Sequence, residues 1–399
     1  MMKWLFLHPT MLTDFDPALY FDCSATTPPR PEAMAAVVNA MQSQWGNPSS
    51  LHLWGQRAAT VLEIARQQVA SAIGTQSDRI VFTSGGTEAD NLAVMGIARR
   101  YATPQHLIIS SVEHSAIDNA ARRLEGEGWQ VARLPVSADG VIAPDTLSRA
   151  LQNNTALVSV IHGQSEVGTL QPIAALGAVC RAAEVPFHTD AVQTMGRLEI
   201  DVESLPVDLL SLSSHKIYGP QGAGALYIRS GLDLAPLSLG GKQENQMRAG
   251  TQAVPAIAGF GMAAQLICQD IQVETARLRS LQRRLASALA DIPALTLTGP
   301  SNLDARLPHH LSYVVRDRTG EWLVVQLSRQ GMAISSGSAC NSGQLSPSRV
   351  LLAMGYSSEG ALGAIRLTLG HHSTEAGVDR LANTLRTLLS RDPLSAISA

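Results

Sequence analysis

Short apolar stretches rich in β-branched residues alternate with longer helical patterns from residue 79 to residue 229. This alternation is typical of βα units around a mostly parallel sheet, and it predicts a large α/β domain. Between the strands we expect helices that include 88–100 and 173–183. The predicted strands are 79–83, 107–110, 131–135, 156–162, 185–190, 208–213 and 224–229.

Further helical patterns follow toward the C-terminus, where the composition changes. We expect one helix at about 254–271, a charged amphipathic helix at 274–290 and a last helix at 376–389. Shorter strands and helices lie between the last two. The first of these helices is expected to close the large domain, and the rest predict a smaller α+β domain.

These patterns divide the chain into three parts. We predict an N-terminal extension and small-domain segment at 1–29, a large domain at 30–271 and a C-terminal small domain at 272–399. In the small domain, serine and glycine residues surround Cys340 within 331–347. That composition predicts a mobile loop.

Composition excludes several classes of function. Hydrophobic residues make up 45% of the 399 residues and charged residues 16%, which is typical of an ordinary globular protein. The net charge of -3 argues against a nucleic-acid partner, and no apolar run approaches the ~20 residues of a membrane span. The four cysteines have no zinc-ligand or CxxC spacing, so we expect neither a metal site nor disulfides, and we expect a cytoplasmic location.

Polar residues follow several predicted strands, at the edge where open α/β sheets bind ligands. After 79–83, Gly85, Gly86 and Thr87 form a turn that opens a helix. The free backbone N–H groups of such a turn bind anions, although Thr87 can also act as a simple helix cap. Because the chain lacks G-x-G-x-x-G and P-loop motifs, the turn favours a phosphate other than that of a nucleotide.

A lysine follows the strand at 208–213. Ser213, Ser214, His215 and Lys216 place two hydroxyls, an imidazole and an amine at one strand end. This combination suits phosphate binding and a covalent bond to an aldehyde, because a desolvated lysine loses its proton more readily. A solvated loop lysine is the alternative.

Two more strand ends carry groups that suit an aromatic heterocycle. Asp190 ends the strand at 185–190, and Gln193 follows three residues later. The carboxylate can pair with a protonated ring nitrogen and the amide with a neighbouring phenolic oxygen, whereas the alternative for Asp190 is a helix cap. His114, beyond 107–110, can stack on the ring or remain a surface or capping histidine. Together these clusters describe a site for pyridoxal 5'-phosphate.

The same residues carry a resemblance to the cysteine desulfurases, which are fold-type I pyridoxal-phosphate enzymes. The resemblance runs from Tyr20 to about Leu389 and implies a homodimer with a mostly parallel large domain and a smaller α+β domain. The segments that carry it are 21–22, 25–28, 83–91, 113–114, 188–193, 213–220, 248–251, 335–340 and 365–370.

The resemblance implies a role for each site residue. Lys216 would bind the cofactor aldehyde, His114 would stack on the ring, Asp190 would pair with the pyridine nitrogen and Gln193 with the phenolic oxygen. Gly86, Thr87, Ser213 and His215 would hold the phosphate, and Thr251 would reach the phosphate of the other subunit.

The resemblance also assigns the substrate and the sulfur acceptor. Arg366 matches the arginine that binds the substrate carboxylate, a role that suits its planar fork, although a structural ion pair is the alternative. Cys340 matches the nucleophile that receives sulfur. Its serine-rich surroundings resemble the subgroup whose long mobile loop hands sulfur to iron–sulfur scaffold and carrier proteins.

Three positions depart from the family pattern. Ser165 stands where the family usually has an asparagine near the cofactor oxygen and the substrate. Lys242 interrupts the usual glycine run. Cys23 lies beside the usual Asp-x-Ala-Ala-type start and is either a second thiol or, as we expect, a buried inert cysteine.

The predicted function is conversion of L-cysteine to L-alanine. The sulfur would be carried as a persulfide on Cys340 for iron–sulfur cluster assembly or another thiol acceptor. The alternatives are a selenocysteine or cysteine C–S lyase of the same fold, or a catalytically silent scaffold.

Overall fold

Two sheets organise the molecule in the computed structural model, which describes residues 15–337 and 346–390. The larger sheet has seven strands in the order β1-β7-β6-β5-β4-β2-β3, and all seven predicted strands are present. Strands β2 to β6 pair in parallel, whereas β7 is antiparallel to β1 and β6. The strands are β1 (Ile80–Thr83), β2 (His106–Ser110), β3 (Gln130–Leu134), β4 (Thr155–Ile161), β5 (Phe187–Asp190), β6 (Leu209–Ser213) and β7 (Gly224–Ile228).

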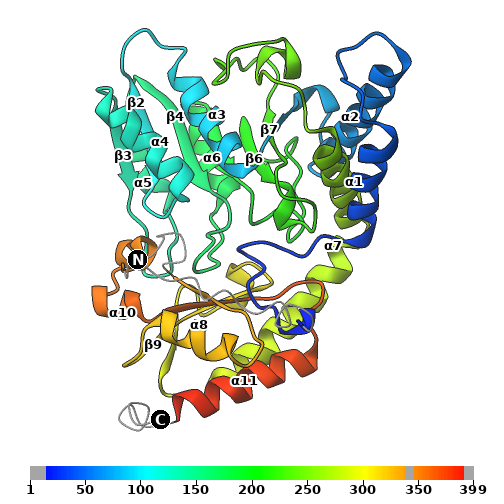
Figure 1. Cartoon of the computed structure of the whole chain (residues 1–399). Coiled ribbons are helices and arrows are strands. Elements are labelled where there is room, and N and C mark those ends of the chain that lie inside the picture. Colours follow the sequence, from blue (N-terminus) through cyan, green and yellow to red (C-terminus); the bar gives the residue numbers. More distant parts are fainter. Residues whose placement is uncertain (1–14, 338–345, 391–399) are drawn as a thin grey trace, which may run out of the picture.

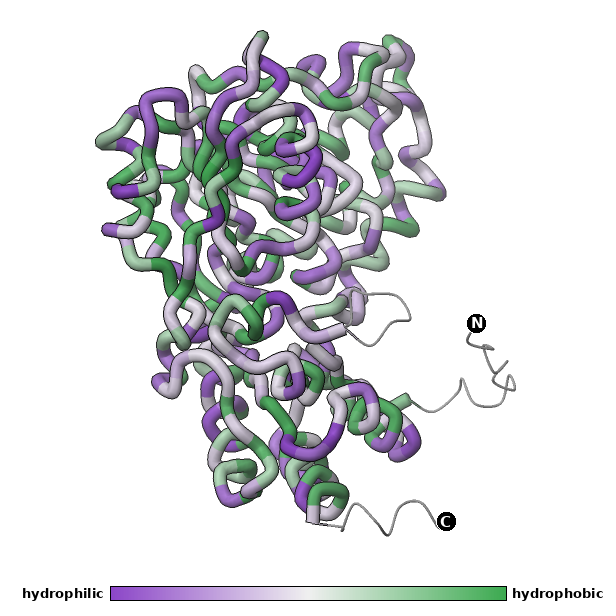
Figure 2. The backbone as a smooth tube through the Cα atoms, turned by 90° about the vertical axis from the view of Figure 1, so that its left-hand side faces the viewer, coloured by the Kyte–Doolittle hydropathy of each residue, from purple (hydrophilic) through white to green (hydrophobic). Residues whose placement is uncertain are grey.

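Helices cover both faces of this sheet, so most of its strands are buried throughout. Helices α3 (Gly86–Ala98) and α4 (Ser115–Gly126) share one apolar core with one set of alternating strand residues. The other face packs against α1 (Pro31–Ser43), α2 (Leu53–Ser71), α5 (Pro144–Ala150) and α6 (Ile173–Ala182). Figure 2 shows hydrophobic segments of the backbone running through the middle of this larger part.

The smaller sheet is antiparallel, with the order β10-β11-β9-β8. The N-terminal segment joins it, because Tyr20 bridges to Ala333 and Asp22 to Thr368. Its strands are β8 (Leu295–Leu297), β9 (His310–Val315), β10 (Ser335–Ser336) and β11 (Ala364–Thr368). The helices in this region are α8 (Gly320–Ser328), α9 (Arg349–Ala353), α10 (Ser358–Leu362) and α11 (Glu375–Leu389) (Figure 1). Short 3-10 turns lie at Pro17–Leu19, Ser77–Arg79, Ser214–Lys216, Gln243–Gln246 and Leu303–Ala305.

One continuous helix, α7 (Val254–Leu289), connects the two parts (Figure 1). The prediction of separate helices at 254–271 and 274–290 is therefore wrong. Neither Gln272 nor Val273 is a helix-breaking residue. The change in composition instead reflects a change in the helices that pack against α7, from α1 and α2 to α11. Although α7 is long and apolar enough to cross a membrane, its apolar residues contribute to both cores, so it is a core helix of this fold.

Candidate active site

A cavity of about 340 Å³ lies where the carboxyl ends of the parallel strands approach the smaller sheet. It brings together the starts of α3 and α4, the ends of β5 and β6, and Arg366 on β11. Every residue that we predicted to bind the cofactor lines it except Thr251. Arg366 and Ser165, which we expected to bind the substrate, line it as well. The lining residues are Ser24, Ala25, Gly86, Thr87, Asp90, His114, Ile161, Ser165, Asp190, Val192, Gln193, Ser213, His215, Lys216 and Arg366.

One side of the cavity has the properties of a phosphate site. Gly86 begins α3, whose first backbone N–H groups lack partners within the helix. A Cβ atom at Gly86 would lie only 2.7 Å from Cγ2 of Val192, so the close packing here requires glycine. Ser213 Oγ is buried without a hydrogen-bond partner among the described residues. A phosphate would satisfy this hydroxyl and the helix N–H groups together.

Lys216 lies directly after β6, in the 3-10 turn Ser214–Lys216. Its Nζ donates to the carbonyl oxygens of Ser24 at 2.6 Å and Ala25 at 2.7 Å. The sequence contains three lysines, Lys3, Lys216 and Lys242. Of the two in the described part of the chain, Lys216 is the one that lines the cavity, so it is the amine available to an aldehyde there.

Two buried carboxyl groups, Asp190 and Asp90, line the cavity, and a third, Glu113, lies near Asp190. Asp190 lies at the end of β5, and burial raises its pKa. Its Oδ1 accepts a hydrogen bond from Val192 N at 2.9 Å. Burial and the nearby Asp190 raise the pKa of Asp90 on α3 well above its usual range. Its Oδ1 lies 3.8 Å from His188 Nε2 and has no hydrogen-bond partner among the described residues. Burial also raises the pKa of Glu113 to about 8. A cationic ring nitrogen beside Asp190 would offset this concentration of buried acid.

Our sequence reasoning missed Asp90 and Glu113 as parts of the site. Asp90 lies in the middle of an apolar stretch of α3, and a single acidic residue at such a position gives no functional signal. Glu113 precedes the predicted His114, but its carboxyl group accepts hydrogen bonds from Ser110 Oγ and Ile161 N instead of facing solvent. Only the tertiary packing shows that both acids lie near Asp190.

Glu113 gives a pH-dependent prediction for stability. Its folded pKa of about 8 exceeds the ordinary 4.5, so the folded state holds the proton more tightly than the unfolded state. Relative to Glu113→Gln, the wild type should lose about 1.4 kcal/mol of unfolding free energy for each pH unit between 4.5 and 8. Urea unfolding of both proteins at several pH values measures this difference. A constant difference across that window would contradict a protonated Glu113.

His114 and His215 are neutral groups in this setting, and His114 also caps a helix. His114 Nδ1 accepts the N–H of Ala116 at 3.2 Å at the start of α4, and burial lowers its pKa. Burial, together with Lys216, lowers the pKa of His215 to about 4. The amide of Gln193 donates to Ser24 O at 2.9 Å, beside Lys216. The cap explains the orientation of His114, whose ring lines the cavity as stacking on a cofactor requires.

Arg366 has structural partners and also lines the cavity. Its Nη2 donates to Asp22 Oδ1 at 2.8 Å, and its Nη1 donates to the backbone oxygen of Ser165 at 3.0 Å. Its buried Nε has no partner among the described residues. The structural ion pair that we considered is thus present, although Arg366 also lines the cavity.

The structure does not bring Thr251 into the cavity, and Cys340 lies outside the described residues. Thr251 is exposed. A smaller hollow of about 200 Å³ shares Ser165 and Arg366 with the cavity and is lined by Gly337 and Ser348 on either side of 338–345. Cys23 is buried, and burial raises the pKa of its thiol to about 12, which fits an inert thiol.

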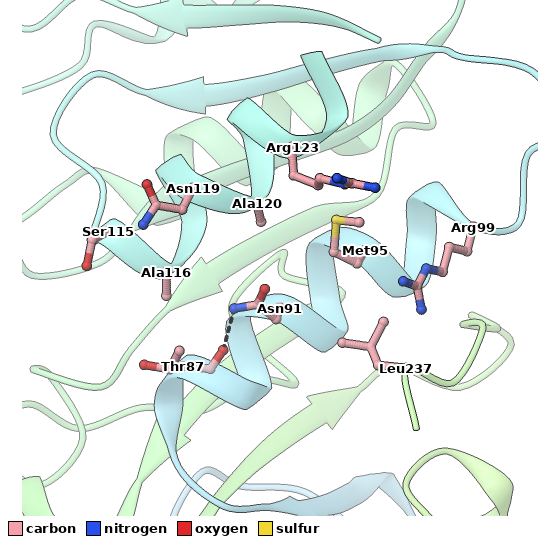
Figure 3. Close-up of a pocket in the computed structure, with 10 residues that line it drawn as sticks. All are labelled: Thr87, Asn91, Met95, Arg99, Ser115, Ala116, Asn119, Ala120, Arg123 and Leu237. Carbon is pink, nitrogen blue, oxygen red and sulfur yellow. Dashed lines mark hydrogen bonds between the residues drawn. The ribbon is translucent and has the colours of Figure 1, made fainter. Parts of the chain in front are cut away.

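A groove of about 400 Å³ runs between α3 and α4 (Figure 3). Thr87 lines both this groove and the cavity, so the two meet at the first turn of α3. Asn91 on α3 and Asn119 on α4 lie along the groove, with Arg99 and Arg123 toward its far end (Figure 3). Thr87 therefore lies between the groove and the phosphate side of the cavity.

Comparison with known proteins agrees with this geometry. The model of the class-V aminotransferase family matches residues 19–381. A cysteine desulfurase IscS from Dictyoglomus turgidum is 40% identical over 94% of this chain and 95% of its own, and one from Methanosarcina thermophila is 41% identical over 94% and 92%. The structure of a NifS-like protein matches with a TM-score of 0.88 and 32% identity, covering 94% of this chain and 99% of that one. The chain therefore belongs to the class-V aminotransferase family, among its cysteine desulfurases.

Proposed function

We propose that this protein is a pyridoxal-phosphate-dependent cysteine desulfurase that converts L-cysteine to L-alanine and receives the sulfur on Cys340. One observation carries the proposal: Lys216, Asp190, Ser213 and Arg366 line the same cavity although they lie on four different elements. An amine, a ring-nitrogen partner, a phosphate ligand and a carboxylate ligand are thereby assembled at one place. Formation of alanine from L-cysteine by the purified protein with added cofactor tests this proposal.

The cofactor would lie between the start of α3 and the buried acids. Its phosphate would be held by Gly86, Thr87, Ser213 and His215. The polar atoms of its ring would pair with Asp190 and Gln193, and the face of the ring would stack on His114. When bound, pyridoxal phosphate supplies an electron sink that weakens the bonds at the substrate α- and β-carbons. Lys216 Nζ would accept the α-proton of the substrate.

The sulfur step requires a second nucleophile. The thiolate of Cys340 would attack the substrate sulfur, forming an S–S bond while the Cβ–S bond breaks and its electron pair stays with carbon. Carbon is thereby reduced, the transferred sulfur is oxidised to the sulfane level, and protonation of carbon yields alanine. Gly337, which lines the adjoining smaller hollow, lies three positions before Cys340 in the sequence, so the chain limits the distance between their Cα atoms to about 11 Å.

A homodimer is part of the proposal. Large apolar side chains are exposed along α1 and α2 and between them, which is unusual for a monomer surface. They include Met34, Met41, Trp45, Leu53 and Trp54. A second copy would cover this surface and bring its Thr251 to the phosphate, as the family resemblance implies.

The proposed setting is the cytoplasm, with iron–sulfur scaffold or sulfur carrier proteins as acceptors. Two of the relatives compared above are named IscS, which supports a role in iron–sulfur cluster assembly. Among the described residues, Cys23, Cys180 and Cys268 are free cysteines.

Arg366→Lys tests the carboxylate role while keeping a positive charge beside Asp22. Because lysine lacks the planar fork, kcat/KM for L-cysteine should fall about 10- to 100-fold, as expected for loss of a charged hydrogen bond of roughly 1.5–3 kcal/mol. Turnover of cysteamine, which has no carboxylate, should be unchanged. Equal losses with both substrates would show that Arg366 has a purely structural role.

A further inference from the structure

Residues 243–251, here called the strap, have an unusual backbone. Glu244, Asn245 and Gln246 all have positive φ angles, at 47°, 52° and 68°. Three consecutive residues other than glycine in the left-handed region are uncommon and costly, so surrounding contacts must impose this conformation. Such local strain often marks a functional segment, and the strap ends at Thr251.

The main anchor of the strap is the buried carboxylate of Glu244, whose side chain is 1% exposed. Arg66 on α2 donates to its two oxygens at 2.7 and 2.8 Å. Phe82 N on β1 donates to it at 2.8 Å, and Gln252 Nε2 donates at 3.1 Å. The Arg66 guanidinium also lies 4.6 Å from the centre of the Phe82 ring. Both carboxylate oxygens are therefore fixed to the large sheet and its covering helix.

A second anchor joins the strap to the phosphate side of the same chain. Arg248 Nε donates to Glu88 Oε1 at 2.9 Å, and Glu88 lies in the first turn of α3 beside Thr87. Despite these two anchors, Thr251 is exposed, and Leu239 just before the strap is 88% exposed. No residue of the strap lines the cavity of its own chain. The strap is thus anchored at two points of its own chain without contributing a residue to the lining of its own cavity.

We propose that Arg66 and Glu244 are positioning residues that hold the strap so that its Thr251 completes the phosphate site of a second copy of this chain. The inference rests on the proposed dimeric, cofactor-binding function. The groove between α3 and α4 gives the approach, because it meets the cavity at Thr87 (Figure 3). Along it, Asn119 presents an amide group to the backbone of an incoming strap, as does Asn91, whose Nδ2 also donates to Thr87 O at 2.8 Å.

The first test compares pyridoxal phosphate with pyridoxal, which lacks the phosphate. Glu244→Gln should weaken binding of pyridoxal phosphate about 10- to 100-fold, the effect of losing one hydrogen bond to a charged group, and leave pyridoxal binding unchanged. Thr251→Ala should do the same, and combining the two changes should add little to either. Fluorescence titration of the cofactor-free proteins measures these affinities.

Glu274→Gln is the matched control, because Glu274 is also a buried carboxylate that accepts two hydrogen bonds from one arginine, Arg277, at 2.8 Å each. It should not alter the ratio of the two affinities. Arg66→Lys provides a second variant that keeps the charge but loses the fork, and Thr251→Ala, at an exposed position, tests the strap without touching a buried pair. A strap variant that weakens both ligands equally would overturn the proposal.

Hybrid dimers separate action on the partner from action within one chain. In a dimer of a Lys216→Ala chain and a Glu244→Gln chain, the one site with Lys216 receives an unaltered strap from its partner. That site should bind pyridoxal phosphate like the wild type. When both changes are in the same chain and the partner is wild type, the remaining site should show the full loss.

Covalent label on Lys216 after borohydride reduction, followed over a titration with pyridoxal phosphate, measures the affinity of the one competent site in each hybrid. The reverse pattern would show that the strap acts within its own chain, which overturns the inference and leaves the proposed function intact. A chain that is monomeric by sedimentation, or that takes up no label at any cofactor concentration, would instead overturn the proposed function.

Discussion

Replacing Lys216 with alanine is expected to abolish covalent attachment of the cofactor. It should also lower the rate of alanine formation from L-cysteine by about 10²–10⁴-fold or more, because loss of an acid–base group has an effect in that range. The loss is expected to be large because Lys216 is the lysine that lines the cavity in the described part of the chain. Its Nζ is assigned two tasks, holding the aldehyde and accepting the α-proton. The other lysine of the described residues, Lys242, does not line the cavity and so is not placed to replace it.

Borohydride reduction followed by peptide mapping measures the attachment. Wild-type protein should carry the label on Lys216 alone. Lys242→Ala is the matched control, because Lys242 is an exposed lysine outside the cavity, and it should keep the label on Lys216. A label on another lysine would refute the assignment of Lys216.

Replacing Cys340 with serine is expected to have a comparably large effect on product with no effect on the cofactor. The variant should retain covalently bound cofactor and bind L-cysteine through Arg366, yet form almost no alanine or persulfide. A serine hydroxyl is a far weaker nucleophile than a cysteine thiol. With an ordinary pKa of about 8.5, a thiol is already a few per cent thiolate at neutral pH. Mass spectrometry of wild-type protein after cysteine treatment should find added sulfur on Cys340.

Two other cysteines provide controls for this experiment. Cys23 is buried with a raised pKa, whereas Cys268 on α7 is exposed but lines no part of the cavity. Serine at either position should leave alanine formation nearly unchanged. Sulfur found on Cys23 with Cys340 unmodified would show that the proposed acceptor is wrong while the cofactor site stands.

Much of the larger sheet and of the cavity could be predicted because both depend on local sequence and on one topological rule. Apolar β-branched stretches identified all seven strands. The parallel pairing of β2 to β6 then brings the residues that follow β5 and β6, Asp190 and Lys216 among them, to one edge. His114 and Gly86 were found in the same way, because each lies just after a strand.

The features that could not be predicted depend on contacts between distant positions. Arg366 pairs with Asp22 across 344 residues, and Glu244 with Arg66 across 178 residues, without any local pattern. Asp90 resembles any acidic residue in a helix until folding buries it near Asp190. The continuity of α7 was missed because its neighbours change along its length while its backbone does not break.

The most direct test of the central claim is the product balance of a single sample. Purified protein with pyridoxal phosphate is incubated with L-cysteine, and alanine, pyruvate, sulfide and protein-bound sulfane sulfur are measured with and without a reducing thiol. We predict one alanine per sulfur transferred, with the sulfur held on the protein when no reductant is present and released as sulfide when it is added. Pyruvate and free sulfide without alanine would identify a C–S lyase, and the absence of any product from cofactor-loaded protein would identify a silent scaffold; either result would contradict a cysteine desulfurase.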